Sequence, residues 1–326
     1  MKPKCLITLE LPDDIRAPLE QRYEVLTWPG PERLSEQVLG ELLSATEGLL
    51  CALSKPISAS LLNSAKALKV VSMISVGVDH IDLAAATRKG IAVGHTPGVL
   101  VDSTADLALA LMLGVTRRVA EADRWIRGAN WTQGWQSDLL LGTDLSQAKV
   151  GVVGLGPIGQ AVVKRLAGFG ARVLVWNRTY RPVEGAEWVE LDALFAESDI
   201  VTLHTALTED TQHIASRARL AMMPDRAVLI NTGRGPLVDE SALLDELSSA
   251  RLRAGLDVFQ VEPLPIDHPF LSLDNVVLLP HVGSATAATR HAMVARALGN
   301  LHAGIAGERV PFCANPEVYR VSASAR

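Results

Sequence analysis

The chain has 326 residues, of which 48% are hydrophobic and 21% charged, and its formal net charge is −5. A chain of this length is longer than a domain with a single hydrophobic core usually is, so we predict two globular domains. The proportion of hydrophobic to charged residues is typical of folded domains and argues against disorder. The sequence has no cluster of lysines and arginines that would indicate a nucleic-acid-binding face. Its apolar runs are all well short of the roughly 18 residues that a membrane span needs.

The cysteines are an odd number without the spacing of metal ligands: Cys5, Cys51 and Cys313. We therefore expect reduced thiols, a cytoplasmic location and no metal site. The N-terminal segment has only a short apolar stretch before charged residues begin, which predicts a first strand and not a signal peptide.

Short apolar runs alternate with helical patterns through the first hundred residues. Strands are predicted at 4–8, 48–51, 70–74 and 91–93, and helices at 13–22, 58–65 and 82–88. Such alternation predicts a parallel sheet covered by helices. One long helix is then expected from Asp102 to Arg127. Its apolar residues fall on most faces, which predicts burial between domains or at a subunit interface.

A second series of strands and helices begins at Lys149. Strands are predicted at 150–153, 172–176, 199–203, 227–231, 253–256 and 276–278, and helices at 160–169, 240–249 and 285–305. The predicted fold class is therefore α/β, with two domains of parallel sheet flanked by helices.

The strongest local motif lies directly between a predicted strand and a predicted helix. Gly154 permits a tight turn, Gly156 lets the backbone approach a pyrophosphate, and Gly159 lets the helix pack on the strand. The helix N-terminus would offer free N–H groups to phosphates. The alternative is a glycine-rich turn without a ligand. The predicted cofactor contacts in the motif are Gly154, Leu155, Gly156, Pro157, Ile158 and Gly159.

The end of the next strand is where NAD enzymes place an acidic residue for the ribose hydroxyls. Asn177, Arg178 and Thr179 stand there instead, and this segment holds no carboxylate. A guanidinium pairs well with a 2′-phosphate, so we predict NADP(H), with NAD(H) possible. The alternative is that Arg178 is a solvated loop residue.

Three polar residues further along fit one reaction. Arg234 lies between two glycines after a strand, where its guanidinium suits a substrate carboxylate. His281 follows the last predicted strand, and carbonyl reduction needs a proton donor of this type. Glu262 could hold that imidazole and stabilise its protonated form. Taken singly, Glu262 and His281 each have an ordinary structural alternative.

Four segments occur together in one order: GLGPIG from Gly154, INTGRG from Ile230, AGLDVFQVEP from Ala254 and LLPHVGSAT from Leu278. With them the chain resembles the D-isomer-specific 2-hydroxyacid dehydrogenase family over almost its full length. Within the family it is most similar to glyoxylate/hydroxypyruvate reductases, including the 2-ketogluconate reductases grouped with them.

The resemblance implies NADPH-dependent reduction of a small 2-oxo acid, such as glyoxylate or hydroxypyruvate, to the D-2-hydroxy acid. It implies that Arg234 binds and polarises the oxo acid, His281 protonates the keto oxygen and Glu262 holds His281. Further implied contacts are Val76, Gly77 and Ser284 with the substrate, and Thr104, Thr232 and Asp257 with the cofactor. No metal is needed, because Arg234 and His281 already supply positive charge to the oxyanion.

The resemblance also implies two Rossmann-like domains. Residues 102–290 would bind the dinucleotide, and residues 1–101 with 291–326 would bind the substrate. The active site would lie in the cleft between the domains, and closure would exclude water.

A homodimer through the long helix is expected, with Trp135 reaching the partner's substrate pocket. Ordinary packing at the dimer interface is the alternative for Trp135. A 2-ketogluconate reductase or another D-2-hydroxyacid dehydrogenase is the alternative activity. An alternative of another class is a dinucleotide-sensing binding protein similar to the corepressors built on this fold.

Overall fold

The computed structural model describes residues 2–28, 35–52 and 56–320. The chain divides into two compact units, Met1–Val99 with Thr286–Arg326, and Leu100–Ala285. We expected the second division after residue 290. It falls before helix α11 (Ala287–Ala306), because this helix packs on strands of the first unit through residues from Met293 onward.

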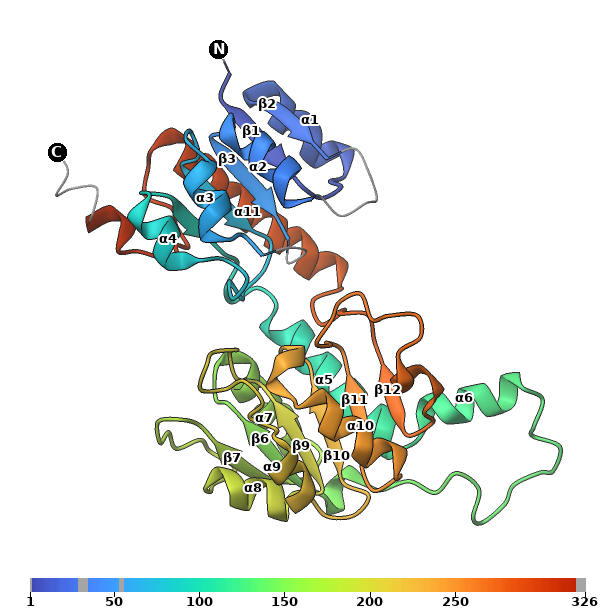
Figure 1. Ribbon diagram of the computed structural model, residues 1–326. Helices are drawn as coiled ribbons and strands as arrows, with labels where there is room; N and C mark the ends of the chain where they lie inside the picture. The colour runs from blue at the N-terminus through green and yellow to red at the C-terminus, as the bar shows by residue number, and fades with distance from the viewer. Residues whose placement is uncertain (1, 29–34, 53–55, 321–326) are drawn as a thin grey trace. The chain divides into compact units, whose positions relative to one another are not determined.

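The first unit contains one parallel sheet in the order β2-β1-β3-β4-β5 (Figure 1). Its strands are β1 (Lys4–Ile7), β2 (Glu24–Thr27), β3 (Gly48–Cys51), β4 (Val70–Met73) and β5 (Ala92–Gly94). Its helices are α1 (Asp13–Arg22), α2 (Glu36–Ser44), α3 (Ala59–Ser64), α4 (Leu83–Arg88) and α11.

Alternating side chains of these strands serve two faces of the sheet. Leu49 and Val71 join the core formed with α2, α3 and α4. Their neighbours Gly48 and Val70 face α11 instead, where a Cβ on Gly48 would meet Ile305 at 2.6 Å. Both faces are therefore covered, as an all-parallel sheet requires.

The second unit contains a seven-stranded parallel sheet in the order β12-β11-β10-β9-β6-β7-β8. Its strands are β6 (Lys149–Val153), β7 (Arg172–Trp176), β8 (Ala186–Trp188), β9 (Ile200–Leu203), β10 (Val228–Asn231), β11 (Arg253–Leu256) and β12 (Val276–Leu278). Renumbered within the unit, this is the Rossmann order 3-2-1-4-5-6 with one added strand. The strand order reverses between β6 and β9, which is where such sheets bind ligands beyond the carboxyl ends.

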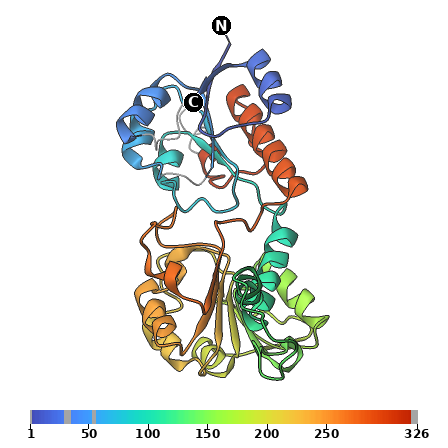
Figure 2. The ribbon, with the colours of Figure 1, turned by 90° about the vertical axis from the view of Figure 1, so that its right-hand side faces the viewer.

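Helices cover both faces of this sheet (Figure 2). The helices are α5 (Val101–Thr116), α6 (Val119–Arg127), α7 (Pro157–Ala167), α8 (Leu191–Glu197), α9 (Arg217–Met222) and α10 (Glu240–Ser248), with short 3-10 turns η1 (Leu145–Gln147), η2 (Gly235–Leu237) and η3 (Pro269–Ser272). One core layer includes side chains of α5 and α7, and the other includes side chains of α8, α9 and α10. The predicted α/β class with parallel sheets is confirmed.

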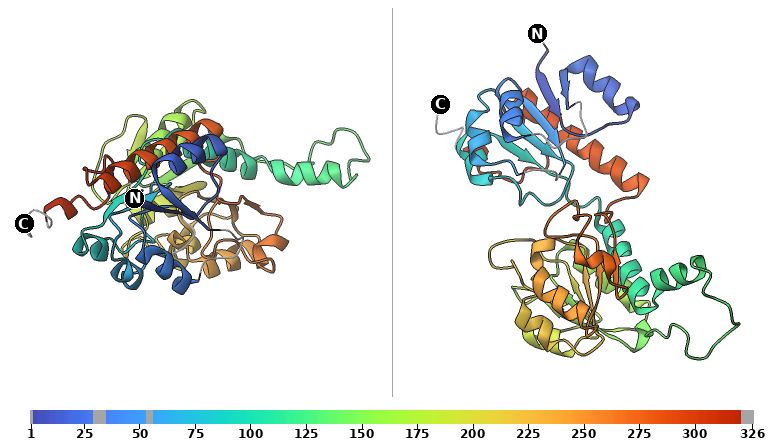
Figure 3. Two further views of the ribbon diagram at one scale, coloured as in Figure 1. Left: turned by 90° about the horizontal axis from the view of Figure 1, so that it is seen from above. Right: turned by 45° about the vertical axis from the view of Figure 1, so that its right-hand side comes forward.

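The single helix expected over 102–127 is wrong. It breaks after Thr116, and α6 begins behind Arg118, whose backbone is left-handed at φ 54°. The returning chain contributes to the break, because Thr143 N–H donates to the Thr116 carbonyl at 3.0 Å. Helix α5 is buried within its own unit against α7 and strands β10 to β12, whereas α6 buries no residue. Figure 3 shows α6 and the following segment extending away from the sheet.

Two glycines of α11 allow a direct test of this packing. We expect Gly304→Ala to lower the free energy of unfolding by about 1–3 kcal/mol, because its Cβ would collide with the Val70 side chain. Gly299→Ala is the matched control on the same helix, since a Cβ there meets nothing within 4 Å. It should raise stability by about 0.5–1 kcal/mol. Denaturant titration measures both, and equal effects would contradict the packing of α11 on β4.

Candidate active site

The glycine-rich turn joins β6 to α7 and has three distinct steric environments. Gly154 is left-handed at φ 97°, and a Cβ there would meet the backbone of His204 at 2.8 Å. A Cβ on Gly159 would collide with the carbonyl oxygen of Gly154. Gly156 faces open space, with nothing within 4 Å of its ideal Cβ. The turn is therefore closed where helix and strand meet and open where a ligand would approach.

These features fit a pyrophosphate group. The first N–H groups of a helix have no partner within the helix, and α7 presents its N-terminus at the open side of the turn. Thr232, on the turn after β10, carries a buried hydroxyl without a hydrogen-bond partner among the described residues. A buried hydroxyl of this kind fits a place beside a bound polar ligand.

The end of β7 is joined to the glycine-rich turn by Asn177. Its Oδ1 accepts from the Leu155 N–H at 3.1 Å, and its Nδ2 donates to the Thr179 carbonyl at 2.9 Å. Arg178 beside it is exposed and lies 3.9 Å from the carboxylate of Asp210. The local segment holds no carboxylate, but Asp210 approaches Arg178 from the loop after β9, which sequence reasoning about the segment alone did not anticipate.

The turn after β10 is shaped by a side chain that the sequence motif did not single out. Asn231 Oδ1 accepts from the Gly233 N–H at 3.0 Å, and its Nδ2 donates to the Arg234 carbonyl at 2.8 Å. Arg234 Nη1 donates to the Gly233 carbonyl at 2.8 Å. Any Cβ on Gly235 would collide with the backbone of Phe259, so this turn lies directly against the loop after β11. The sequence signal that could have identified Asn231 is an Asn directly before a tight turn.

Glu262 and His281 form the central polar pair of the site. His281 Nδ1 donates to Glu262 Oε2 at 2.7 Å, and the other carboxylate oxygen accepts from the Phe259 N–H at 3.0 Å. Their side chains are 35% and 34% exposed, respectively. His281 has a left-handed backbone at φ 54°. The two residues that sequence alone could not place side by side are therefore in direct contact.

Burial of Glu262 by itself would raise the pKa of its carboxyl group. The hydrogen bond and charge of His281, the Phe259 N–H and the charge of Arg234 act the other way, and together they lower the pKa of Glu262 below its usual value. Arg234 follows β10, Glu262 follows β11 and His281 follows β12, and these three strands are neighbours in one parallel sheet. Three side chains from the ends of β10, β11 and β12 thus gather at one edge of the sheet.

Asp257 holds the loop that carries His281. Its two carboxylate oxygens accept from the N–H groups of Val282 at 2.7 Å and Gly283 at 2.8 Å. Asp257 is fully buried, and this burial raises the pKa of its carboxyl group despite the two hydrogen bonds. Thr104, at the start of α5, donates to the Gly283 carbonyl at 3.2 Å. Contact of Asp257 and Thr104 with a cofactor stays a prediction.

Four further residues were predicted as substrate contacts. Val76 and Gly77 follow β4 in the first unit, where His95 Nδ1 donates to the Val76 carbonyl at 2.9 Å and Ser75 Oγ to the Gly77 carbonyl at 2.7 Å. Ser284 is half-buried beside Gly283. Trp135 is 87% exposed. The roles proposed for these four residues stay predictions.

Comparisons with known proteins agree with this architecture. The family model described as D-isomer specific 2-hydroxyacid dehydrogenase, NAD binding domain, matches residues 109–283. A glyoxylate reductase of Korarchaeum cryptofilum is 40% identical over 98% of both chains. A glyoxylate reductase/hydroxypyruvate reductase of Mus musculus is 42% identical over 95% of this chain and 98% of that protein.

A solved structure of an NADPH-dependent glyoxylate/hydroxypyruvate reductase from Sinorhizobium meliloti, in complex with NADP and malonate, is also similar. Its TM-score is 0.87 at 30% identity, and the match covers 97% of this chain and 98% of that chain.

The Rossmann sheet, its glycine-rich turn and these relatives define an NAD(P)-dependent dehydrogenase. More particularly, the chain belongs to the D-isomer-specific 2-hydroxyacid dehydrogenase family, and it acts in the reduction of 2-oxo acids. None of the described helices is long and apolar enough to cross a membrane. The three cysteines are free thiols.

The Glu262–His281 pair predicts a specific change in pH dependence. Because the pKa of Glu262 is lowered, its negative charge is present at neutral pH and is lost only as pH falls through that lowered pKa. Glu262→Gln cannot stabilise an imidazolium. We therefore expect kcat/KM for reduction to drop by about 100-fold at neutral pH, and its basic limb to move to lower pH.

The control Glu187→Gln removes an exposed carboxylate that pairs with Arg172 in the same unit. Its pH profile should match that of the unaltered enzyme. An unchanged basic limb in Glu262→Gln would show that this carboxylate does not govern the proton donor.

Proposed function

We propose that this enzyme uses NADPH to reduce glyoxylate or hydroxypyruvate to the D-2-hydroxy acid. The observation that carries the proposal is the hydrogen-bonded pair of Glu262 and His281 close to Arg234. The names of the mouse and Sinorhizobium meliloti relatives support the substrate class.

In the proposed reaction, a bound nicotinamide supplies hydride to the carbonyl carbon. His281 supplies the proton. Its Nδ1 is engaged with Glu262, so Nε2 is the nitrogen that can donate to the keto oxygen. Glu262 fixes the ring and stabilises its protonated form. The imidazole is thereby oriented before the substrate binds.

Arg234 would bind the oxo acid. Its planar guanidinium can donate two parallel hydrogen bonds to the carboxylate and also stabilise negative charge that develops on the neighbouring oxygen. Backbone N–H groups at Val76 and Gly77 would hold the carboxylate further, and Ser284 would line the pocket. Because Arg234, Val76, Gly77 and Ser284 would only bind the substrate, His281 alone would protonate the keto oxygen.

Preference for NADPH would come from Arg178. Its partner Asp210 is an exposed carboxylate at 3.9 Å, and an exposed ion pair of this kind contributes little in water. A 2′-phosphate offers more charge and better hydrogen-bond geometry to the same guanidinium. Asn177 holds the loop and Thr179 lies beside it, so Arg178 is the residue expected to distinguish the two cofactors.

A homodimer would account for the surface of α6 and of the segment that follows it. Its large apolar side chains are exposed within the single chain: Val119, Trp125, Ile126, Trp131, Trp135 and Leu141. A group of exposed apolar side chains of this size is typical of an interaction surface. We propose that a second copy covers it and that Trp135 reaches the partner's substrate pocket.

A substrate panel tests the proposed activity. We expect kcat/KM with NADPH to be highest for glyoxylate or hydroxypyruvate, lower for pyruvate and lower for 2-ketogluconate. The product should be the D isomer when hydroxypyruvate is the substrate. A highest value for 2-ketogluconate would establish the alternative activity, and no turnover of any of the four would overturn the proposal.

Equilibrium binding tests the cofactor preference. Arg178→Ala should weaken NADPH binding by about 10- to 100-fold and change NADH binding by less than about threefold, because only the former carries a 2′-phosphate. Asp210→Asn should move the ratio of the two affinities the other way. Titration of nicotinamide fluorescence measures both. If Arg178→Ala weakens the binding of NADPH and of NADH equally, the guanidinium does not bind the 2′-phosphate.

A further inference from the structure

The amino edge of the sheet in the second unit, opposite the candidate active site, gathers several arginines. Helix α5 begins at the carboxyl edge, where Thr104 donates to the Gly283 carbonyl. Its 16 residues span about 24 Å and pack across β10, β11 and β12, so its C-terminal end reaches the amino edge. Arg118, which directly precedes α6, is therefore placed at that edge.

Two more arginines reach the same edge from neighbouring strands. Arg253 is the first residue of β11 and pairs in register with Val228, the first residue of β10. Arg226 stands two residues before Val228, and its N–H donates to the Arg251 carbonyl at 2.6 Å. Neighbouring strands lie about 4.8 Å apart, so Arg226 and Arg253 are close neighbours.

The acids at this edge are already engaged. Glu121 accepts two hydrogen bonds from Arg118, at 2.7 and 2.6 Å. Asp274, just before β12, accepts from Arg124 at 3.3 Å. We call Arg118, Arg124, Arg226 and Arg253 the basic cluster. Arg118 and Arg124 bind the first two carboxylates, and the carboxylate of Asp225, next to Arg226, lies 3.8 Å from the Arg251 guanidinium.

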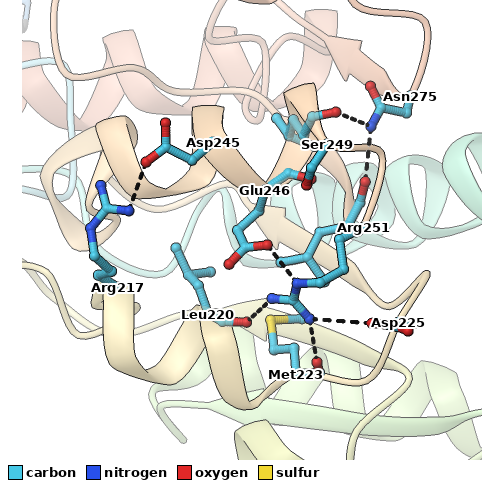
Figure 4. A network of polar contacts seen from close by, with 11 residues as sticks. Arg217, Leu220, Met223, Asp225, Asp245, Glu246, Ser249, Arg251 and Asn275 are labelled. Carbon is cyan, nitrogen blue, oxygen red and sulfur yellow. Dashed lines mark hydrogen bonds and ion pairs between the residues drawn. The ribbon is translucent and has the colours of Figure 1, made fainter.

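Arg251, in the same region, is an arginine whose guanidinium has several hydrogen-bond partners (Figure 4). Its guanidinium donates to Glu246 at 2.5 Å and to the carbonyls of Met223 and Leu220 at 2.6 Å each. Across the described part of the chain, by contrast, the side chains of Arg226 and Arg253 form no hydrogen bond or ion pair. The basic cluster thus has two guanidinium groups without a hydrogen-bond partner in the described protein, of which Arg226 is exposed to solvent and Arg253 is half-buried.

Arg253 is half-buried, and this placement is only partly compensated by a nearby anion. Its burial, followed by the nearby charges of Arg226 and Arg118, lowers the pKa of the Arg253 guanidinium, and the charge of Glu121 offsets this only in part. A partly desolvated cation beside like charges costs free energy unless a negative group pairs with it. A ligand that brings two or more negative charges would remove that cost.

We propose that the basic cluster binds a small multivalent oxyanion of the phosphate class. Guanidinium groups match a phosphate through paired, charge-assisted hydrogen bonds, and a tetrahedral anion can accept from more than one arginine. The site lies at the edge of the sheet opposite His281, so it is separate from the glycine-rich turn and from Arg234. It is independent of the proposed substrate.

Inorganic phosphate is the probe, titrated into the full-length chain at constant ionic strength and near neutral pH. The enzyme should be saturated with NADPH and a non-reacting dicarboxylate, so that its active site is filled. We expect calorimetry to detect phosphate binding, and the midpoint of thermal unfolding to rise by at least about 2 °C. Arg253→Gln should weaken the binding at least about tenfold.

Arg226→Gly is the second variant. Arg226 has a left-handed backbone at φ 65°, which glycine adopts without strain, so this variant removes the charge without unfolding the turn. It too should weaken phosphate binding at least about tenfold. Arg217→Gln is the matched control, because Arg217 is an exposed arginine of the same unit that pairs with Asp245 at 2.6 Å (Figure 4). It should bind phosphate like the unaltered chain, and all three variants should keep their turnover in phosphate-free buffer.

Two outcomes would overturn the proposal. Equal phosphate binding by all the variants would place the anion elsewhere. Absence of binding to the unaltered chain would also overturn it; if Arg226→Gly or Arg253→Gln then shifts the equilibrium between monomer and dimer, carboxylates of a second copy meet these charges.

Discussion

The carboxylate of Asp257 is the constraint on which the polar site depends. It is fully buried and accepts from two consecutive N–H groups, which fixes the loop directly after His281. The left-handed backbone of His281 is held between this anchor and the end of β12. Glu262 can therefore meet an imidazole whose position is set by backbone contacts. A hydrogen-bonded pair held in this way does not depend on substrate for its alignment.

Parallel strands explain why separate motifs meet. Each motif follows a strand of one sheet, and in a parallel sheet all carboxyl ends lie along one edge. Gly235 is needed because the turn after β10 lies against the backbone of Phe259. The same Phe259 donates its N–H to Glu262. One close backbone contact therefore links the turn that carries Arg234 to the loop that carries Glu262.

Sequence reasoning could find the residues of this site but not their contacts. Arg234 and His281 stand at the ends of buried apolar runs, so their edge of the sheet could be predicted. The contact of Glu262 with His281 could not, because it depends on the register of β11 and β12 and on two loops. The break at Arg118 left no local signal, since it involves residue 143 returning to Thr116. Short elements such as β2 and α8 were missed because their apolar patterns span few residues.

Asp210 illustrates how tertiary structure changes an argument made from one segment. In the sheet β6 lies between β7 and β9, so the glycine-rich turn is flanked by the loops of both neighbours. Arg178 comes from one loop and Asp210 from the other. A phosphate monoester carries a charge of about −1.5 to −2 near neutral pH, more than one carboxylate, and it can accept two hydrogen bonds from the guanidinium. If Arg178 binds the 2′-phosphate as proposed, Asp210 opposes that attraction from the other loop, and the balance of the two loops would set the cofactor preference.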